Sequence, residues 1–185
     1  MIKKPFFYFK NILRLPINIL KKNSISLSVR ISNNVLIARS KVGMNSYIAC
    51  NVVIVNTEIG NYCSIAPGVQ IGGMEHSYWW LSSSTFLSDK CSYNNRVIIG
   101  NDVWIAAGSI IKQGVKIGNS SVIGALSFVN KDVPENSIVF GNPAKIYKNR
   151  FDEEIFKKLK DTEFWNYDIN EAKKILKEFE LDNNY

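Results

Sequence analysis

The sequence predicts a mainly β protein in which short parallel strands stack into a triangular prism. Two observations lead to this fold class. Aliphatic residues recur every six positions from Ile99 to Val129, and every five or six positions from Ile31 to Ile71. A step of six is not a multiple of the helical period of about 3.6 residues, so one face of a helix cannot produce it.

Three successive steps cover seventeen residues in the first half of this region and eighteen in the second, so each turn of the chain has three flat sides. The fourteen aliphatic positions that point inward are Ile31, Ile37, Val42, Ile48, Ile54, Ile59, Ile65, Ile71, Ile99, Ile105, Ile111, Ile117, Ile123 and Val129. An ordinary β-sandwich would have to match all of them by coincidence. Gly60, Gly100, Gly118 and Gly124 are expected to allow tight corners.

Residues 1–28 form a basic N-terminal segment ahead of the prism. The first thirty residues hold seven lysines and arginines and no acidic residue, so they carry the whole net charge of +7. Phe6, Phe9, Leu13, Ile17 and Leu20 share one helical face, which is too short and too charged to span a membrane. Residues 1–24 therefore either lie on an anionic membrane surface or cap the first coil.

The prism domain is expected over residues 29–143, and its rhythm stops after Ile71 and resumes at Ile99. Residues 72–98 thus leave the prism as an extruded loop, and loops of this length are usually functional. The loop contains His76, the single histidine of the chain, followed by Tyr78, Trp79 and Trp80. An imidazole can accept a proton from a hydroxyl near neutral pH, which makes His76 a candidate general base or else an incidental loop residue. The aromatic residues either stack on a substrate ring or pin the loop to a neighbouring coil.

Residues 144–185 are expected to form a helical C-terminal cap over the last coil. Asp152 can cap a helix that begins at Glu153, and residues 169–179 carry a second apolar stripe. Trp165 is expected to anchor this tail.

The cysteine and histidine content of the chain argues against a cysteine nucleophile and against a metal site. Cys50, Cys63 and Cys91 have no metal-type spacing, and their odd number suits a reducing, cytoplasmic setting. Cys63 occupies an inward position, so we expect a buried filler and not a nucleophile. A zinc site of three histidines is excluded by the single histidine, and no metal is expected.

Four stretches of the sequence resemble a known family, the hexapeptide-repeat acyltransferases, and within it the xenobiotic acetyltransferase subgroup. They read "IGNYCSIAPGVQIGG", "IIGNDVWIAAGS", "VNKDVPENSIVFGNPAKIYKNRF" and "FDEEIFKKLKDTEFWNYDI". The resemblance implies a left-handed parallel β-helix, a homotrimer, acetyl-CoA as the acyl donor and a catalytic histidine at the start of the loop, which is His76.

The same resemblance implies where acetyl-CoA binds. The expected cofactor-binding residues are Trp104, Ala107, Ala125, Asn130, Lys131, Lys145, Lys148 and Arg150. Trp104 and Ala107 would border the site, Ala125 would contact the pantetheine arm through its main chain, and the last three would hold the CoA phosphates. Asn130 departs from the threonine that the family often has at this position.

The sequence thus predicts an O-acetyltransferase that acts on a saccharide hydroxyl in surface polysaccharide synthesis. Tyr78, Trp79 and Trp80 are the expected substrate-binding residues, and no nucleic-acid partner is expected. A chloramphenicol-type O-acetyltransferase, acylation of an amino-sugar amine and a non-catalytic β-helix scaffold remain as alternatives.

Overall fold

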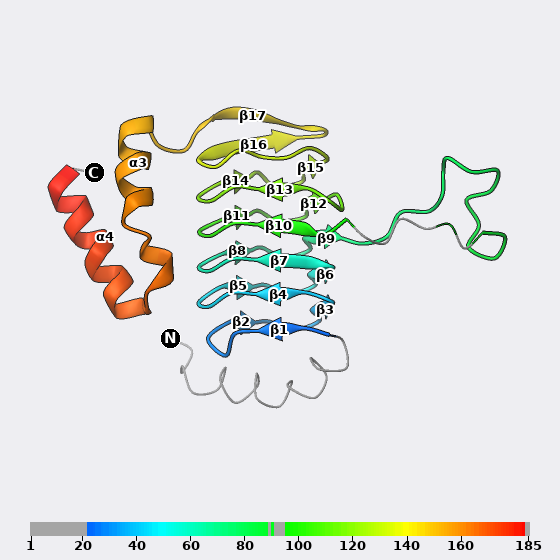
Figure 1. The fold of residues 1–185 in the computed structure, drawn as a ribbon, viewed down its shortest axis with the longest axis horizontal. Coiled ribbons are helices and arrows are strands. Elements are labelled where there is room, and N and C mark those ends of the chain that lie inside the picture. Colours follow the sequence, from blue (N-terminus) through cyan, green and yellow to red (C-terminus); the bar gives the residue numbers. More distant parts are fainter. Residues whose placement is uncertain (1–21, 89, 91–94, 184–185) are drawn as a thin grey trace.

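The computed structural model describes residues 22–88, 90 and 95–183, and its strands form three sheets that are the sides of a prism and are parallel except at the last strand (Figure 1). Sheet A contains β1 (Ser24–Ile25), β4 (Lys41–Val42), β7 (Thr57–Ile59), β10 (Val97–Ile99) and β13 (Lys116–Ile117). Sheet B contains β2 (Arg30–Ile31), β5 (Tyr47–Ile48), β8 (Ser64–Ile65), β11 (Trp104–Ile105), β14 (Val122–Ile123), β16 (Ser137–Gly141) and β17 (Ala144–Asn149). Sheet C contains β3 (Leu36–Ala38), β6 (Val53–Val55), β9 (Gln70–Gly72), β12 (Ile110–Ile111) and β15 (Phe128–Val129).

The interior of the prism confirms the six-residue rhythm. All fourteen aliphatic positions are buried, and the most exposed of them, Ile37, shows only 6% of its surface. Buried serines between them satisfy their hydroxyl groups within the chain, as Ser109 Oγ does by donating to the Gly124 carbonyl at 2.8 Å. Apolar burial is the main favourable term in folding, so this stack is the principal source of stability.

The corner between sheets A and B, called here the helix corner, shows why glycine is needed at these turns. A Cβ on Gly60 would lie 2.6 Å from the Gly100 carbonyl oxygen of the next coil, so glycine is needed there for close approach. The left-handed backbone of the turn falls instead on Tyr62, Asp102 and Ser120, whose φ angles are 54–58°.

Asparagines join successive coils at the helix corner. Asn101 Oδ1 accepts a hydrogen bond from the Asn61 N–H at 2.8 Å, and Asn119 Oδ1 accepts one from the Asn101 N–H at 2.7 Å. These bonds satisfy backbone donors that the tight turn would otherwise leave buried without a partner.

The ends of the prism differ from expectation. It begins at Ser24, because β1 pairs with β4, and not at residue 29. Residues 1–21, on which most of the membrane hypothesis rests, lie outside the described residues. After Pro143 the chain forms β17 antiparallel to β16, so the helical part starts nine residues later than the change of pattern suggested. No helix in the described part of the chain is long and apolar enough to cross a membrane.

The C-terminal tail contains α3 (Glu153–Asp161), a 3₁₀ turn η1 (Phe164–Asn166) and α4 (Ile169–Asn183). As predicted, Asp152 caps α3 by accepting a hydrogen bond from the Ile155 N–H at 2.9 Å. The tail packs along the helix corner and does not cover the last coil, which corrects the expected cap (Figure 1). Trp165 is buried, and its carbonyl accepts a hydrogen bond from the Asn61 side chain at 3.1 Å.

Candidate functional site

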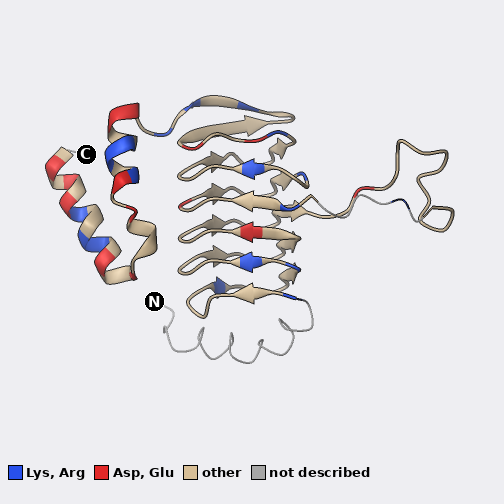
Figure 2. Ribbon diagram, in the orientation of Figure 1, with Lys and Arg blue, Asp and Glu red and all other residues tan. Residues whose placement is uncertain are grey.

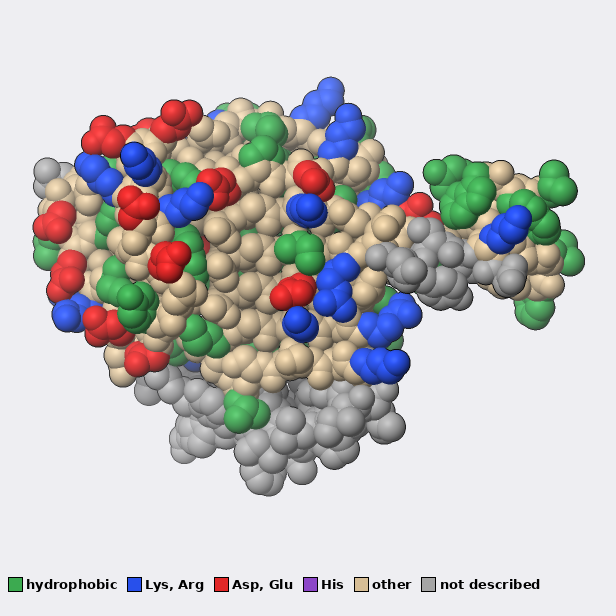
Figure 3. Space-filling view, viewed as in Figure 1, with side chains coloured by type: hydrophobic (Ala, Val, Ile, Leu, Met, Phe, Trp, Pro, Cys, Tyr) green, Lys and Arg blue, Asp and Glu red, His purple; other side chains and the backbone are tan. Residues whose placement is uncertain are grey.

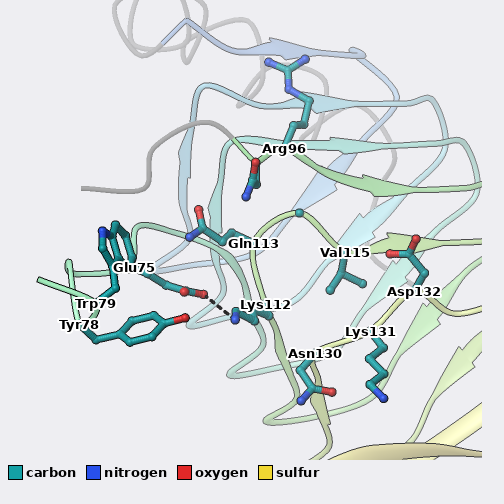
Figure 4. Close-up of a pocket in the computed structure, with 12 residues that line it drawn as sticks. Glu75, Tyr78, Trp79, Arg96, Lys112, Gln113, Val115, Asn130, Lys131 and Asp132 are labelled. Atoms are coloured by element: carbon teal, nitrogen blue, oxygen red, sulfur yellow. Dashed lines mark ion pairs between the residues drawn. The ribbon is translucent and has the colours of Figure 1, made fainter. Parts of the chain in front are cut away.

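The loop leaves the prism where sheet C ends and returns where sheet A begins, and this edge is called here the loop corner. Figure 1 shows the loop projecting away from the prism between β9 and β10, as the broken rhythm predicted. A cavity of about 570 Å³ lies at its root. The residues lining it are Glu75, Tyr78, Trp79, Asn95, Arg96, Lys112, Gln113, Gly114, Val115, Asn130, Lys131 and Asp132. The cavity therefore combines loop residues with the corners of the next two coils, at residues 112–115 and 130–132 (Figure 4).

The cavity is polar and carries charges of both signs. Lys112 Nζ lies 3.4 Å from Glu75 Oε1, a loose ion pair between prism and loop (Figure 4). The Arg96 side chain forms an ion pair with Glu58 on sheet A, with Nη1 3.5 Å from Oε2. Lys131 has no ion-pair partner among residues 22–88, 90 and 95–183, so its ammonium group remains available to a bound molecule.

The predicted aromatic residues divide between two places. Tyr78 and Trp79 line the cavity and meet edge to face, with ring centroids 5.2 Å apart and with 75% and 56% of their surfaces exposed. Trp80 lies elsewhere on the loop, where the Lys90 ammonium sits 5.6 Å from its ring centroid. Hydrophobic side chains gather on the projecting loop (Figure 3), including Leu81 and Phe86, which are almost fully exposed.

His76 is exposed and is oriented by the loop itself. Its Nδ1 atom lies 2.8 Å from the Ser83 carbonyl oxygen, and its own carbonyl accepts a hydrogen bond from the Tyr78 N–H at 2.8 Å. Because a carbonyl only accepts, the neutral ring must carry its proton on Nδ1, which leaves the lone pair on Nε2. The ring is thus prepared to accept a proton at Nε2, although it does not line the cavity of its own chain.

The predicted cofactor residues are spread over four places. Asn130 and Lys131 line the loop-corner cavity together with Tyr78 and Trp79. Ala107 and Ala125 lie one coil apart at the corner between sheets B and C, called here the alanine corner. Both are exposed, and the Ala125 main chain has no hydrogen bond to the described part of the chain.

The other four lie on or beside sheet B. Lys145 and Lys148 are exposed on β17 at the end of the prism. Trp104 is half exposed and shares a groove with Arg150 near the helix corner. Arg150 pairs there with Asp102, with Nη1 2.9 Å from Oδ2, and its contact with the CoA phosphates stays a prediction.

Buried ionisable groups outside the loop corner are structural. Burial raises the pKa of the Asp102 carboxyl, and the neighbouring Arg150 guanidinium opposes that rise. Burial also raises the pKa of the Cys63 thiol to about 12, and its Sγ donates to the Gly100 carbonyl at 3.1 Å. A thiol that stays protonated is not a nucleophile, which agrees with the expected filler role.

Sequence reasoning missed Glu75, Arg96, Lys112 and Gln113. The eighteen-residue period places Lys112 and Gln113 one coil below Asn130 and Lys131, so the same repeat that predicted the core could have found these two. Glu75 and Arg96 lie in the loop, where the sequence has no period from which their positions could be predicted.

The sequence profile of the bacterial transferase hexapeptide family (six repeats) matches residues 96–131. The maltose O-acetyltransferase of Clostridium difficile 630 is 30% identical, with a TM-score of 0.62 and an alignment that covers 74% of each chain. The chain belongs to the hexapeptide-repeat transferases. Its fold is the left-handed parallel β-helix of this family.

Two further relatives extend this result. A hexapeptide-repeat acetyltransferase of Vibrio cholerae, crystallised with acetyl coenzyme A, is 27% identical, with a TM-score of 0.66 and coverage of 77% of this chain and 79% of that one. A chloramphenicol acetyltransferase of Klebsiella aerogenes is 37% identical over 129 residues, which are 62% of this chain and 61% of the relative. The matched region thus spans about three fifths of that curated relative.

Proposed function

We propose that this hexapeptide-repeat transferase moves the acetyl group of acetyl-CoA to a saccharide hydroxyl, in the synthesis of a cell-surface polysaccharide. The observation that carries the acceptor class is the loop-corner cavity, which the Tyr78 and Trp79 rings line together with amides, ammonium groups and two carboxylates. Saccharides present both hydroxyl groups and apolar ring faces, so a polar cavity with aromatic walls suits them. The maltose O-acetyltransferase relative is consistent with this class.

In the proposed reaction His76 is the general base. Its Nε2 accepts the proton of the acceptor hydroxyl while that oxygen bonds to the thioester carbonyl carbon. The tetrahedral intermediate then breaks its carbon–sulfur bond, and the imidazolium returns the proton to the departing thiolate. The Ser83 carbonyl holds the Nδ1 proton throughout and stabilises the positive ring.

The assembly that completes this site is a trimer. Four of the five outward residues in the sheet C column are apolar, with Leu36 opposite Val53 and Ile110 opposite Phe128, and Gln70 is the polar exception between the two pairs. Sheet A carries Lys41, Glu58 and Lys116 at its outward positions (Figure 2). A polar side suits water and an apolar side suits a partner, so we place sheet C toward the threefold axis.

This arrangement brings the separated residues together. When sheet C faces the axis, the loop corner of one chain meets the alanine corner of its neighbour. His76, Tyr78 and Trp79 then face Ala107 and Ala125 of the next chain, where the long, thin pantetheine arm can lie between two prisms. Lys145 and Lys148 remain candidates for the CoA phosphates.

Mixed trimers test this placement. His76→Ala and Ala125→Trp subunits are each expected to be inactive in homotrimers. If the site combines residues of two chains, random mixing of the two subunits restores about a quarter of the wild-type activity. No recovery from verified mixed trimers would place both residues in one chain's site and contradict the assembly.

A chloramphenicol-type activity is the second candidate, favoured by the 37% identity to the chloramphenicol acetyltransferase. A thiol-release assay with acetyl-CoA and a panel of hexoses, oligosaccharides and chloramphenicol separates the two. We expect thiol release with saccharides. Release with chloramphenicol alone would replace the proposed acceptor, and no acetyl-CoA turnover or binding would favour a scaffold.

A further inference from the structure

A second cavity lies far from the loop corner, between the C-terminal helices and the prism. Its volume is about 730 Å³, which is within the range of small-molecule sites. Its apolar walls are formed by Phe151, Ile155, Leu159, Phe164, Leu176 and Phe179, with Tyr62 contributed by the helix corner. We call this space the helix cleft.

Helix α4 has one apolar stripe for packing and an adjoining face for the helix cleft, and Phe179 belongs to both. Ala172, Ile175 and Phe179 pack with Trp165 and Phe164 in the small core of the tail. Residues 173, 176, 177 and 180 follow the helical spacing of a second stripe and line the cleft. Leu176 on that stripe retains 36% exposure, so apolar surface stays open to water there.

The charges of the helix cleft favour an anion at its rim. At the floor of the helix cleft, Asp102 and Arg150 form an ion pair in which Oδ2 and Nη1 lie 2.9 Å apart, so their charges cancel. Lys173 and Lys177 stand on the α4 side and have no ion-pair partner among the described residues, whereas the neighbouring Lys174 pairs with Glu171 at 3.7 Å. Glu180 is the one acidic residue lining the cleft besides Asp102, so positive charge prevails at the rim.

The helix cleft is also independent of the acyl-transfer site. It opens at the helix corner, which is the edge of the prism opposite sheet C. In a trimer with sheet C toward the axis this corner points outward, away from the neighbouring chains. A ligand in the helix cleft therefore neither competes with acetyl-CoA nor requires a second chain.

We propose that the helix cleft binds an anionic single-chain amphiphile, with its hydrocarbon chain along Ile155, Leu159 and Leu176 and its anionic head on Lys173 and Lys177. Carboxylate and phosphate heads share the chemistry that the two ammonium groups recognise. The apolar walls require the chain, because inorganic anions offer nothing to bury against them.

Calorimetric titration of the full-length protein tests the proposal, with probes kept below their micellar concentrations. The probes are octyl, decyl and dodecyl phosphate, dodecanoate, dodecanol and inorganic phosphate. We expect saturable binding of one anionic amphiphile per chain, tightening about fourfold for each added methylene. Comparison of dodecyl phosphate with dodecanoate identifies the preferred head.

Matched variants locate the site. Leu176→Asp is expected to weaken dodecyl phosphate binding at least tenfold, whereas Leu181→Asp, on the same helix but outside the cleft and 70% exposed, leaves it unchanged. Lys173→Gln and Lys177→Gln each weaken binding of the charged probes and not of dodecanol. Lys174→Gln is the matched control for these two. Acetyl-CoA binding should be the same in all five variants.

Three results would overturn the proposal. The first is no saturable binding of any amphiphile to the full-length protein. The second is equal affinity for dodecyl phosphate and inorganic phosphate, which would leave an anion site without a role for the apolar walls. The third is binding that Leu176→Asp and Leu181→Asp weaken alike, which would indicate a nonspecific surface. Each of these leaves the proposed acyl transfer untouched.

Discussion

The loop corner and the helix corner are edges of the same prism, yet they differ in almost every physical respect. At the helix corner, an asparagine ladder joins successive coils and the Asp102 carboxylate is paired with Arg150. At the loop corner the repeat is interrupted, Lys131 has no ion-pair partner in the described chain, and an exposed aromatic pair faces a polar cavity. The regular corner stabilises the solenoid, whereas the corner where the repeat breaks can place functional side chains without disrupting the stacked coils.

The largest effect is expected from His76→Asn at the loop corner. The amide can still donate to the Ser83 carbonyl and keep the loop geometry, but it has no basic lone pair to accept a proton. We expect kcat to fall about 10²–10⁴-fold with acetyl-CoA affinity and thermal stability unchanged. Thiol release and calorimetry measure the two quantities, and wild-type turnover by this variant would remove the proposed base.

Arg150→Gln at the helix corner should lower stability and leave turnover unchanged, the reverse of His76→Asn. It leaves the partly buried Asp102 carboxylate without its charged partner, so we expect the free energy of unfolding to fall by about 1–3 kcal/mol. Turnover and acetyl-CoA affinity should stay at wild-type values below the melting transition. Urea unfolding gives the stability, and a selective loss of acetyl-CoA binding would return Arg150 to the CoA phosphates.

Lys112 and Lys131 test whether the charges of the loop-corner cavity contribute to acceptor binding. Replacing either with Gln removes a charged donor from the cavity, and we expect KM for the acceptor to rise about tenfold with little change in stability. Lys116→Gln is the matched control, since Lys116 is an exposed lysine of sheet A that does not line the cavity. Equal effects of all three substitutions would indicate a general loss of positive charge.

The smallest expected effect is a pH dependence at the helix corner. The pKa of Asp102 is raised in the folded protein, so between the unfolded and folded pKa values the native state binds more protons than the unfolded state. Stability therefore falls as pH rises through this acidic range. Asp102→Asn lacks this titration and should lose less stability than wild type between pH 4 and pH 7 in urea unfolding. A larger loss in the variant would reverse the assigned direction.

The prism was predictable because aliphatic residues at steps of five or six have few structural solutions, and all fourteen such positions between Ile31 and Val129 are buried. Features without a period were harder to predict. Strand β17 pairs antiparallel and so has no six-residue rhythm, and the docking of the tail depends on Asn61 and Tyr62, a hundred residues away from their partners.

The candidate site shows the same division. Tyr78 and Trp79 could be predicted because the loop interrupts a strict repeat, and the role of His76 on the same loop stays a prediction. The Arg150–Asp102 pair could not be predicted, because nothing in the local sequence links two residues that lie 48 positions apart. Lys112 shares a corner with Lys131 only after the coils are stacked.

If the loop corner and the alanine corner together bind acetyl-CoA, then calorimetric titration of acetyl-CoA should distinguish the wild-type, Ala125→Trp and Arg150→Gln proteins. We expect the wild-type protein to bind acetyl-CoA saturably at one site per chain. Ala125→Trp should lose this binding, and Arg150→Gln should keep it. Absence of binding to the wild type at millimolar acetyl-CoA, or binding lost only in Arg150→Gln, would contradict this expectation.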